Sequence, residues 1–159
     1  MKKIFILLIF LTSSLLFADK SNEYRNEFGL ALGGNTGYGL MYKHNLNDTI
    51  AIKTTGGFFF DSHNYSYNLG VTLNRSLQRT EILEFYLSGG FLFTSESIYE
   101  NGNEKDYRTL IGLGLSLKPG IFSVSFEFHQ IFEKSVRSQS GRSEFFVYPM
   151  VGVTLGILL

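Results

Sequence analysis

Large apolar residues alternate with small or polar residues along most of the chain after residue 26. The stretch 64–74 displays the pattern clearly, because every second residue is large and apolar: Tyr65, Tyr67, Leu69, Val71 and Leu73. A period of two residues is typical of a β-strand whose two faces meet different surroundings. No helical period of any length interrupts the alternation. The pattern therefore predicts an all-β chain.

Turn-forming residues divide the pattern into eight stretches. The expected strands cover residues 26–34, 37–45, 49–60, 64–74, 83–94, 107–117, 121–132 and 144–158. Most of them match or slightly exceed the roughly 9–11 residues that a tilted strand needs to cross a bilayer.

The two faces of these strands differ in a way that decides which one lies outside. In the last stretch, Val151, Val153 and Leu155 alternate with Gly152 and Thr154. A soluble barrel holds its large apolar residues inside, but this apolar face is too extensive to fit within eight strands. The small and polar face suits a narrow lumen, so the apolar face is expected to contact lipid. The sequence thus predicts an eight-stranded antiparallel up-and-down transmembrane β-barrel.

Connections and aromatic residues agree with this prediction. Periplasmic turns are expected at 44–48, 75–82 and 118–120, and outer loops at 33–37, 61–63, 94–106 and 133–143. The two longest loops fall on the outer side, as such barrels require. Outward aromatics are expected near the outer ends of the strands at Tyr38, Phe58, Phe60, Tyr65, Tyr67, Phe91, Phe93, Tyr107, Phe126, Phe128 and Phe145, and near the opposite ends at Phe28, Tyr42, Phe85 and Phe122. Two aromatic girdles around an aliphatic band are typical of a membrane barrel.

The N-terminus has the layout of a secretory signal peptide. Lys2 and Lys3 precede the apolar run 4–11, and Ala18 offers a small residue before a polar segment. We therefore expect a signal peptide over 1–18 and a barrel domain over 19–159. The alternative is an uncleaved anchor helix, for which the apolar stretch is shorter than the roughly 20 residues that a spanning helix needs.

Cysteine content and charge exclude several classes of protein. The chain has no cysteine, so it carries neither disulfides nor a cysteine-linked lipid anchor. Its 14 basic residues balance its 14 acidic ones, and loss of Lys2 and Lys3 with the signal peptide leaves a slightly acidic domain. Nothing in this balance indicates nucleic acid as a partner.

One segment carries a family resemblance. Residues 39–52 read GLMYKHNLNDTIAI and resemble the strand, N-x-N-D turn and strand of small outer-membrane β-barrels of OmpA-transmembrane, OmpX and opacity-protein type. The whole domain is similar to that family in pattern. The resemblance implies insertion by the outer-membrane assembly machinery. One departure is the C-terminus, which ends in Leu158 and Leu159 where that family usually has an aromatic residue.

A polar set is expected to face the lumen: Lys43, Lys53, Glu84, Arg108, Glu127 and His129. One reading is a buried ion-pair network that plugs the interior. The other is a conduction or proton pathway, which inward glycines would favour by leaving water-sized spaces. Arg108 is the expected partner of Glu127, with Lys53 and Lys43 as the other candidates.

Catalysis and metal binding have weaker support. Ser125, Glu127 and His129 share one strand face, but neighbours at this spacing lie about 7 Å apart, too far for direct proton relay. The other histidines, His44 and His63, fall on a turn and a loop, so the three cannot share a metal site. No catalytic residue, metal or cofactor is expected.

These observations predict a non-enzymatic integral protein of a Gram-negative outer membrane, with a structural or surface-contact role. The alternatives are a narrow channel or transporter for small solutes and, less favoured, an envelope-lipid-modifying enzyme. Expected partners are outer-membrane lipid and lipopolysaccharide, and a host or surface ligand through the outer loops. The loop 94–106 is rich in carboxylates, whereas 133–143 carries Lys134, Arg137 and Arg142. The two loops could pair with each other or bind phosphates.

Overall fold

Eight strands form the protein in the computed structural model, which describes residues 26–33, 37–60, 65–98, 102–137 and 143–159. They are β1 (Asn26–Leu32), β2 (Gly39–Asn45), β3 (Ile50–Phe60), β4 (Tyr65–Arg79), β5 (Leu83–Ile98), β6 (Gly102–Leu117), β7 (Phe122–Arg137) and β8 (Ser143–Leu158). The signal peptide expected over 1–18 lies outside the described residues. Within them, no helix is long and apolar enough to cross a membrane.

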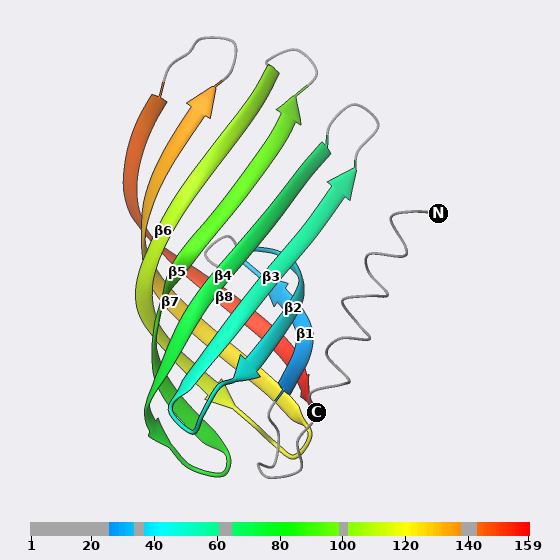
Figure 1. Ribbon diagram of the computed structural model, residues 1–159, viewed down its shortest axis with the longest axis vertical. Helices are drawn as coiled ribbons and strands as arrows, with labels where there is room; N and C mark the ends of the chain where they lie inside the picture. Colours follow the sequence, from blue (N-terminus) through cyan, green and yellow to red (C-terminus); the bar gives the residue numbers. More distant parts are fainter. Residues whose placement is uncertain (1–25, 34–36, 61–64, 99–101, 138–142) are drawn as a thin grey trace.

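The strands make one ring-like sheet. Each strand is antiparallel to the next, and β8 returns to pair with β1, with Glu27 opposite Leu158. Figure 1 shows the strands running alternately up and down. The prediction of an all-β chain with eight antiparallel up-and-down strands is confirmed.

Several strands run further than the sequence pattern predicted. β4 continues to Arg79, β5 continues to Ile98, β6 already begins at Gly102 and β7 continues to Arg137. Much of the expected loops 94–106 and 133–143 is therefore strand, with Glu104 opposite Arg137. The prediction placed strand ends where apolar residues stop, but the ladder is held by backbone hydrogen bonds, which polar residues make equally well.

The wall of the ring is uneven in height. β1 and β2 have seven residues each, whereas β5 to β8 have sixteen each, so the long strands rise well beyond the short hairpin (Figure 1). β1 pairs with β8 only from Val153 onward, which leaves the earlier part of β8 without a β1 partner. Asn26 and Leu159 exchange both backbone hydrogen bonds, so odd-numbered residues of β8 point their N–H groups towards the β1 side. Pro149 lies at such a position, in the part of β8 that pairs with β7 but has no β1 partner. Because proline has no N–H group, it leaves no exposed backbone donor there.

The outer and inner faces of the ring have inverted polarity compared with a soluble protein. On β4, the outward Val71 and Leu73 are 47% and 53% exposed, whereas the inward Thr72 and Asn74 are buried. The same alternation holds on β6 and β7. The predicted facing of these strands is confirmed: large apolar side chains cover the outside and polar ones fill the inside.

Outward aromatics form a continuous row across four neighbouring strands. Phe58 on β3 lies 6.4 Å from Tyr67 on β4, measured between ring centroids. Tyr67 lies 5.9 Å from Phe93 on β5, which lies 5.2 Å from Tyr107 on β6. We call these four residues the aromatic row. They are at the same level, towards the outer ends of their strands, as the sequence predicted.

Three other aromatics do not lie where the sequence placed them. The Tyr38 hydroxyl bonds to that of the inward Ser66 at 2.5 Å, so this ring turns inward over the end of β2. The chain can turn there because the next residue, Gly39, has φ +112°. Phe126 and Phe128 fall in the first half of β7, since that strand continues to Arg137.

The turn between β2 and β3 is stabilised by a single side chain. The Asn47 carboxamide oxygen accepts hydrogen bonds from the backbone N–H groups of Thr49 (2.9 Å) and Ile50 (2.8 Å). This is an Asx turn, which asparagine favours because its short side chain reaches the backbone N–H groups of the residues that follow it. These hydrogen bonds explain why the N-x-N-D segment forms a turn between two strands.

Candidate functional site

The interior of the ring contains two polar layers separated by an apolar one. Along β7, the inward residues Glu127, His129, Ile131 and Glu133 follow one another from the chain-termini side to the outer side. Glu127 belongs to the lower polar layer and Glu133 to the upper one. Ile131 lies between them in the apolar layer. The candidate site is this stack of layers.

The lower layer begins with one carboxylate between two lysines. Glu84 of β5 accepts a hydrogen bond from Lys118, and its Oε2 lies 3.5 Å from Nζ of Lys43. All three residues are nearly inaccessible to solvent. The buried carboxylate of Glu84 therefore has two cationic partners and is not left unpaired.

A second ion pair lies above it at the centre of the ring. Lys53 donates to Glu127, and both side chains are almost completely buried, at 2% and 0% exposure. The Tyr86 hydroxyl donates to the same carboxylate at 2.7 Å, and Nζ of Lys43 lies 5.4 Å from the centre of the Tyr86 ring. This cluster joins β2, β3, β5 and β7 across the lumen.

The expected pairing of Glu127 with Arg108 is wrong. Glu127 lies opposite Gly114, whereas Arg108 lies opposite Glu133, six residues further along β7. At about 3.3 Å per residue the two side chains start roughly 20 Å apart along the strand. The error arose because β7 was expected to end at 132, which placed Glu127 too close to its outer end. Lys53, one of the other two candidates, is the partner.

The apolar layer separates these ion pairs from the upper ones. Leu92, Leu110 and Ile131 are buried against one another, with Tyr148 and Met150 packed beside them. Three different strands, β5 to β7, contribute its centre. Charged groups are absent from this group of five side chains.

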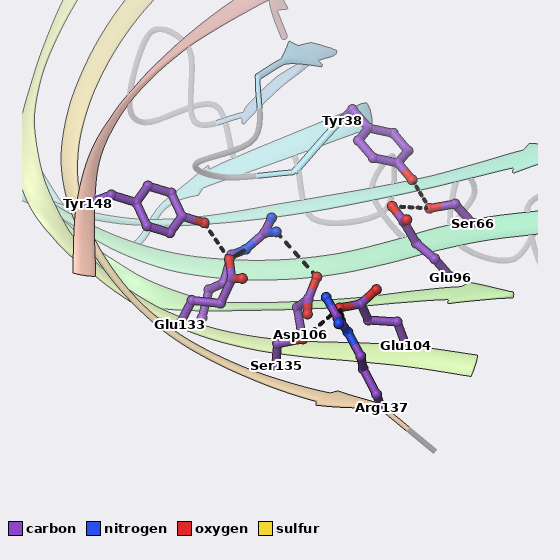
Figure 2. Close-up of polar contacts among 10 residues, drawn as sticks. Tyr38, Ser66, Glu96, Glu104, Asp106, Glu133, Ser135, Arg137 and Tyr148 are labelled. Atoms are coloured by element: carbon purple, nitrogen blue, oxygen red, sulfur yellow. Dashed lines mark hydrogen bonds and ion pairs between the residues drawn. The ribbon is translucent and has the colours of Figure 1, made fainter. Parts of the chain in front are cut away.

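The upper layer is centred on Arg108. Its guanidinium bonds to Glu133 at 2.5 Å and lies 3.4 Å from Asp106, while the Tyr148 hydroxyl donates to Glu133. Figure 2 shows Tyr148, Glu133 and Asp106 converging from three strands on the inner side of the wall. Glu133 and Asp106 were both expected in loops, and they lie on strands with inward side chains instead.

Further polar contacts cover the inner side of the outermost strand ends. Glu104 accepts hydrogen bonds from Ser135 (2.9 Å) and Arg137 (3.1 Å), and the Ser66 hydroxyl lies between Tyr38 and Glu96 (Figure 2). The bonds from Ser135 and then Arg137 lower the pKa of Glu104 below its ordinary value.

At two of the inward glycines, the expected space is occupied by a neighbouring side chain. A Cβ on Gly114 would lie 2.2 Å from the Tyr86 ring, and one on Gly156 would lie 2.5 Å from Glu27. Both side chains are buried. These glycines therefore make room for a packed interior, which argues against the expected water-sized spaces at these two positions.

Two of the three residues considered for hydrolysis have hydrogen-bond partners elsewhere in the interior. Ser125 donates to Ser116 at 3.0 Å, and Glu127 accepts from Lys53 and Tyr86. His129 is completely buried on β7, two residues beyond Glu127. Each of the three thus lies within the packing of the interior, where the sequence placed it.

The structure places all six of the expected lumen residues inside the ring, but in two separate groups. Lys43, Lys53, Glu84 and Glu127 lie in the lower layer, with His129 immediately above it, and Arg108 lies in the upper layer. No histidine, cysteine, aspartate and glutamate group among the described residues has the arrangement of a metal site. His44 bonds to Asn26 at 2.8 Å, and His63 lies outside the described residues.

Sequence reasoning missed four important interior residues. They are Glu27, Tyr86, Lys118 and Glu133, all buried or nearly so. Glu27 accepts a hydrogen bond from Ser123 at 2.5 Å, which joins β1 to β7. The alternation itself could have found Glu27, Tyr86 and Glu133, which have inward parity on their strands, whereas Lys118 lies just beyond the end of β6.

Comparison with family models, with curated proteins and with solved structures finds no match to the chain.

Proposed function

We propose that the chain is an integral outer-membrane β-barrel of a Gram-negative bacterium with a closed lumen, and that its role is structural or in surface contact. The observation that carries the proposal is the inverted polarity of the ring. Leucine, valine and phenylalanine side chains cover the outside, with exposed fractions of 37% at Leu115 and 68% at Phe91. An apolar surface of this extent is stable only when lipid or another apolar partner covers it.

Ring closure and the aromatic row support insertion in a membrane. In lipid, the backbone N–H and C=O groups of a sheet must bond within the protein, so spanning sheets close on themselves. Here β1 pairs with both β2 and β8. The aromatic row lies at one level towards the outer ends of the strands, where aromatic side chains of membrane barrels meet the lipid headgroups.

The interior supports a closed lumen. The Lys53–Glu127 pair, the apolar layer and the Arg108–Glu133 pair follow one another along the interior. Barrels of eight strands have interiors just wide enough for side chains, and the described lumen is filled in this way. We therefore favour a non-enzymatic protein that acts through its outer surface.

Single-channel recording in planar bilayers tests the closed lumen. We expect no reproducible conductance steps from the refolded mature chain, because ion pairs and apolar side chains occupy the interior. As a control, Lys53→Ala with Glu127→Ala removes the central pair and should raise the frequency of brief openings above that of the wild type. Steady conductance of the wild-type chain would favour the narrow-channel alternative instead.

A further inference from the structure

The outer ends of β6 and β7 have opposite charge on their two faces. The inward residues Glu104, Asp106 and Glu133 are carboxylates, and they pair with arginines. The outward residues next to these carboxylates in the sequence include Lys105 and Lys134, both exposed. Residues of the two expected loops do pair, as Glu104 with Arg137, but they do so across neighbouring strands. Their acids lie on the inner face and these lysines on the outer face.

The two lysines are neighbours on the outer face. Lys105 lies opposite Val136, and Lys134 lies opposite Tyr107, so the lysines form a diagonal cross-strand pair. Such pairs lie about 7–8 Å apart, which long side chains easily bridge. Among the described residues, neither lysine takes part in an ion pair. Their charges therefore point outward without an internal acid to neutralise them.

Their height places them at the edge of the apolar belt. Lys105 is two residues beyond Tyr107 of the aromatic row, and Lys134 is two residues beyond the outward Phe132. Phe145, 66% exposed, lies directly opposite Lys134 on β8. Lysine stems pack along such apolar rings while the ammonium groups reach polar surroundings. If the ring spans a bilayer, the level of these outermost aromatics is where side chains meet the lipid headgroups.

We propose that Lys105 and Lys134, with Tyr107 and Phe145 beside them, bind the phosphate of an anionic lipid of the outer leaflet. This inference rests on the proposed function, because it needs the aromatic row to lie at the membrane surface. Charge complementarity selects the occupant: two ammonium groups that have no ion-pair partner among the described residues, beside exposed aromatic rings, fit an anionic headgroup with its acyl chains below. The lysine pair gives β6–β7 a preferred lipid contact on one side of the ring.

Native mass spectrometry of the refolded mature chain with phosphatidic acid tests the inference. Lys105→Gln with Lys134→Gln should raise the dissociation constant for the first bound phosphatidic acid by about fivefold for each lysine, since a surface lysine contributes about 1 kcal/mol to anionic lipid binding. Binding of phosphatidylcholine should not change.

The matched control is Arg75→Gln with Arg137→Gln, which removes the same two charges elsewhere. Arg75 is exposed at the opposite rim, and Arg137 bonds to Glu104 on the inner face. These substitutions should leave the dissociation constant within twofold. Equal weakening by both double variants would show that net charge alone acts and would overturn the assignment. A change of oligomeric state in the lysine variant would assign the pair to a protein contact and overturn it as well.

The result separates the inference from the proposed function. Each sample is first run unheated and heated on SDS gels. A barrel that shows the heat-dependent shift but binds phosphatidic acid equally with and without the lysines contradicts the lipid site alone. A wild-type chain that never shows the shift contradicts the barrel and the lipid site together.

Discussion

Replacing Lys53 by methionine should lower the free energy of unfolding in lipid by about 3–5 kcal/mol, because it leaves the Glu127 carboxylate buried without its cation. Both side chains are at most 2% exposed, so water cannot take the place of the lost partner. Glu127→Gln should destabilise for the converse reason, since the Lys53 ammonium group is then left unpaired. Urea unfolding in vesicles, followed by the heat-dependent gel shift, measures both changes.

The double variant carries the decisive information. With Lys53→Met and Glu127→Gln together no charge is left buried, so the loss should be smaller than the sum of the two single effects. Arg108→Met combined with Glu127→Gln is the matched control. These two residues belong to different layers, and their effects should add to within about 0.5 kcal/mol. Additivity in the Lys53 cycle would show that this pair does not hold the lower layer together.

Arginine at Val71 should cost about 2–4 kcal/mol of folding stability in lipid, because it puts a charge at mid-belt against the acyl chains. Val71 is outward, 47% exposed, and opposite Phe91 on β5. Leu113 on β6 is an equivalent position. The control is Asn103→Arg, an exposed outward position near the outer end of β6, which should cost less than about 1 kcal/mol.

Unfolding in vesicles of fixed composition compares the two arginine variants directly. The belt assignment requires a clear gap between them. Equal stability of Val71→Arg and Asn103→Arg would mean that Val71 does not face lipid.

The period of two residues was sufficient to predict the strands and their facing. It works because a strand with one polar and one apolar face fixes its own register: a slip of one residue would turn every side chain to the wrong side. Lys43, Lys53, Glu84 and Glu127 were placed inside on this argument alone, and all four are buried.

The pattern could not predict how far along the ring axis each inward side chain lies. The positions of Arg108 and Glu127 relative to each other depend on where β7 ends and on the stagger between strands. The alternation of apolar and polar residues gives no information on either the strand end or the stagger. The outer end of β7 is polar, so it resembled a loop. Glu133 was thereby lost as the partner of Arg108, and Lys53, on a strand distant in sequence, could be named only as one of several candidates for Glu127.

The inward turn of Tyr38 also escaped prediction. Tyr38 comes just before β2, and the alternation of that strand would point its side chain outward. Gly39 at positive φ changes the direction of the chain. The backbone of Tyr38 bonds instead to the carboxamide of Asn68, at 3.0 and 3.3 Å. A glycine can be read from the sequence, whereas the conformation it adopts cannot.

The most direct test of the central claim is the location and gel behaviour of the mature protein. The membranes of expressing Gram-negative cells are separated by density, and each fraction is run unheated and heated on SDS gels. We expect the protein in the outer-membrane fraction, migrating faster unheated than heated, because a closed barrel resists SDS until it is boiled. Recovery in the soluble periplasm, with the same mobility before and after heating, would contradict the account.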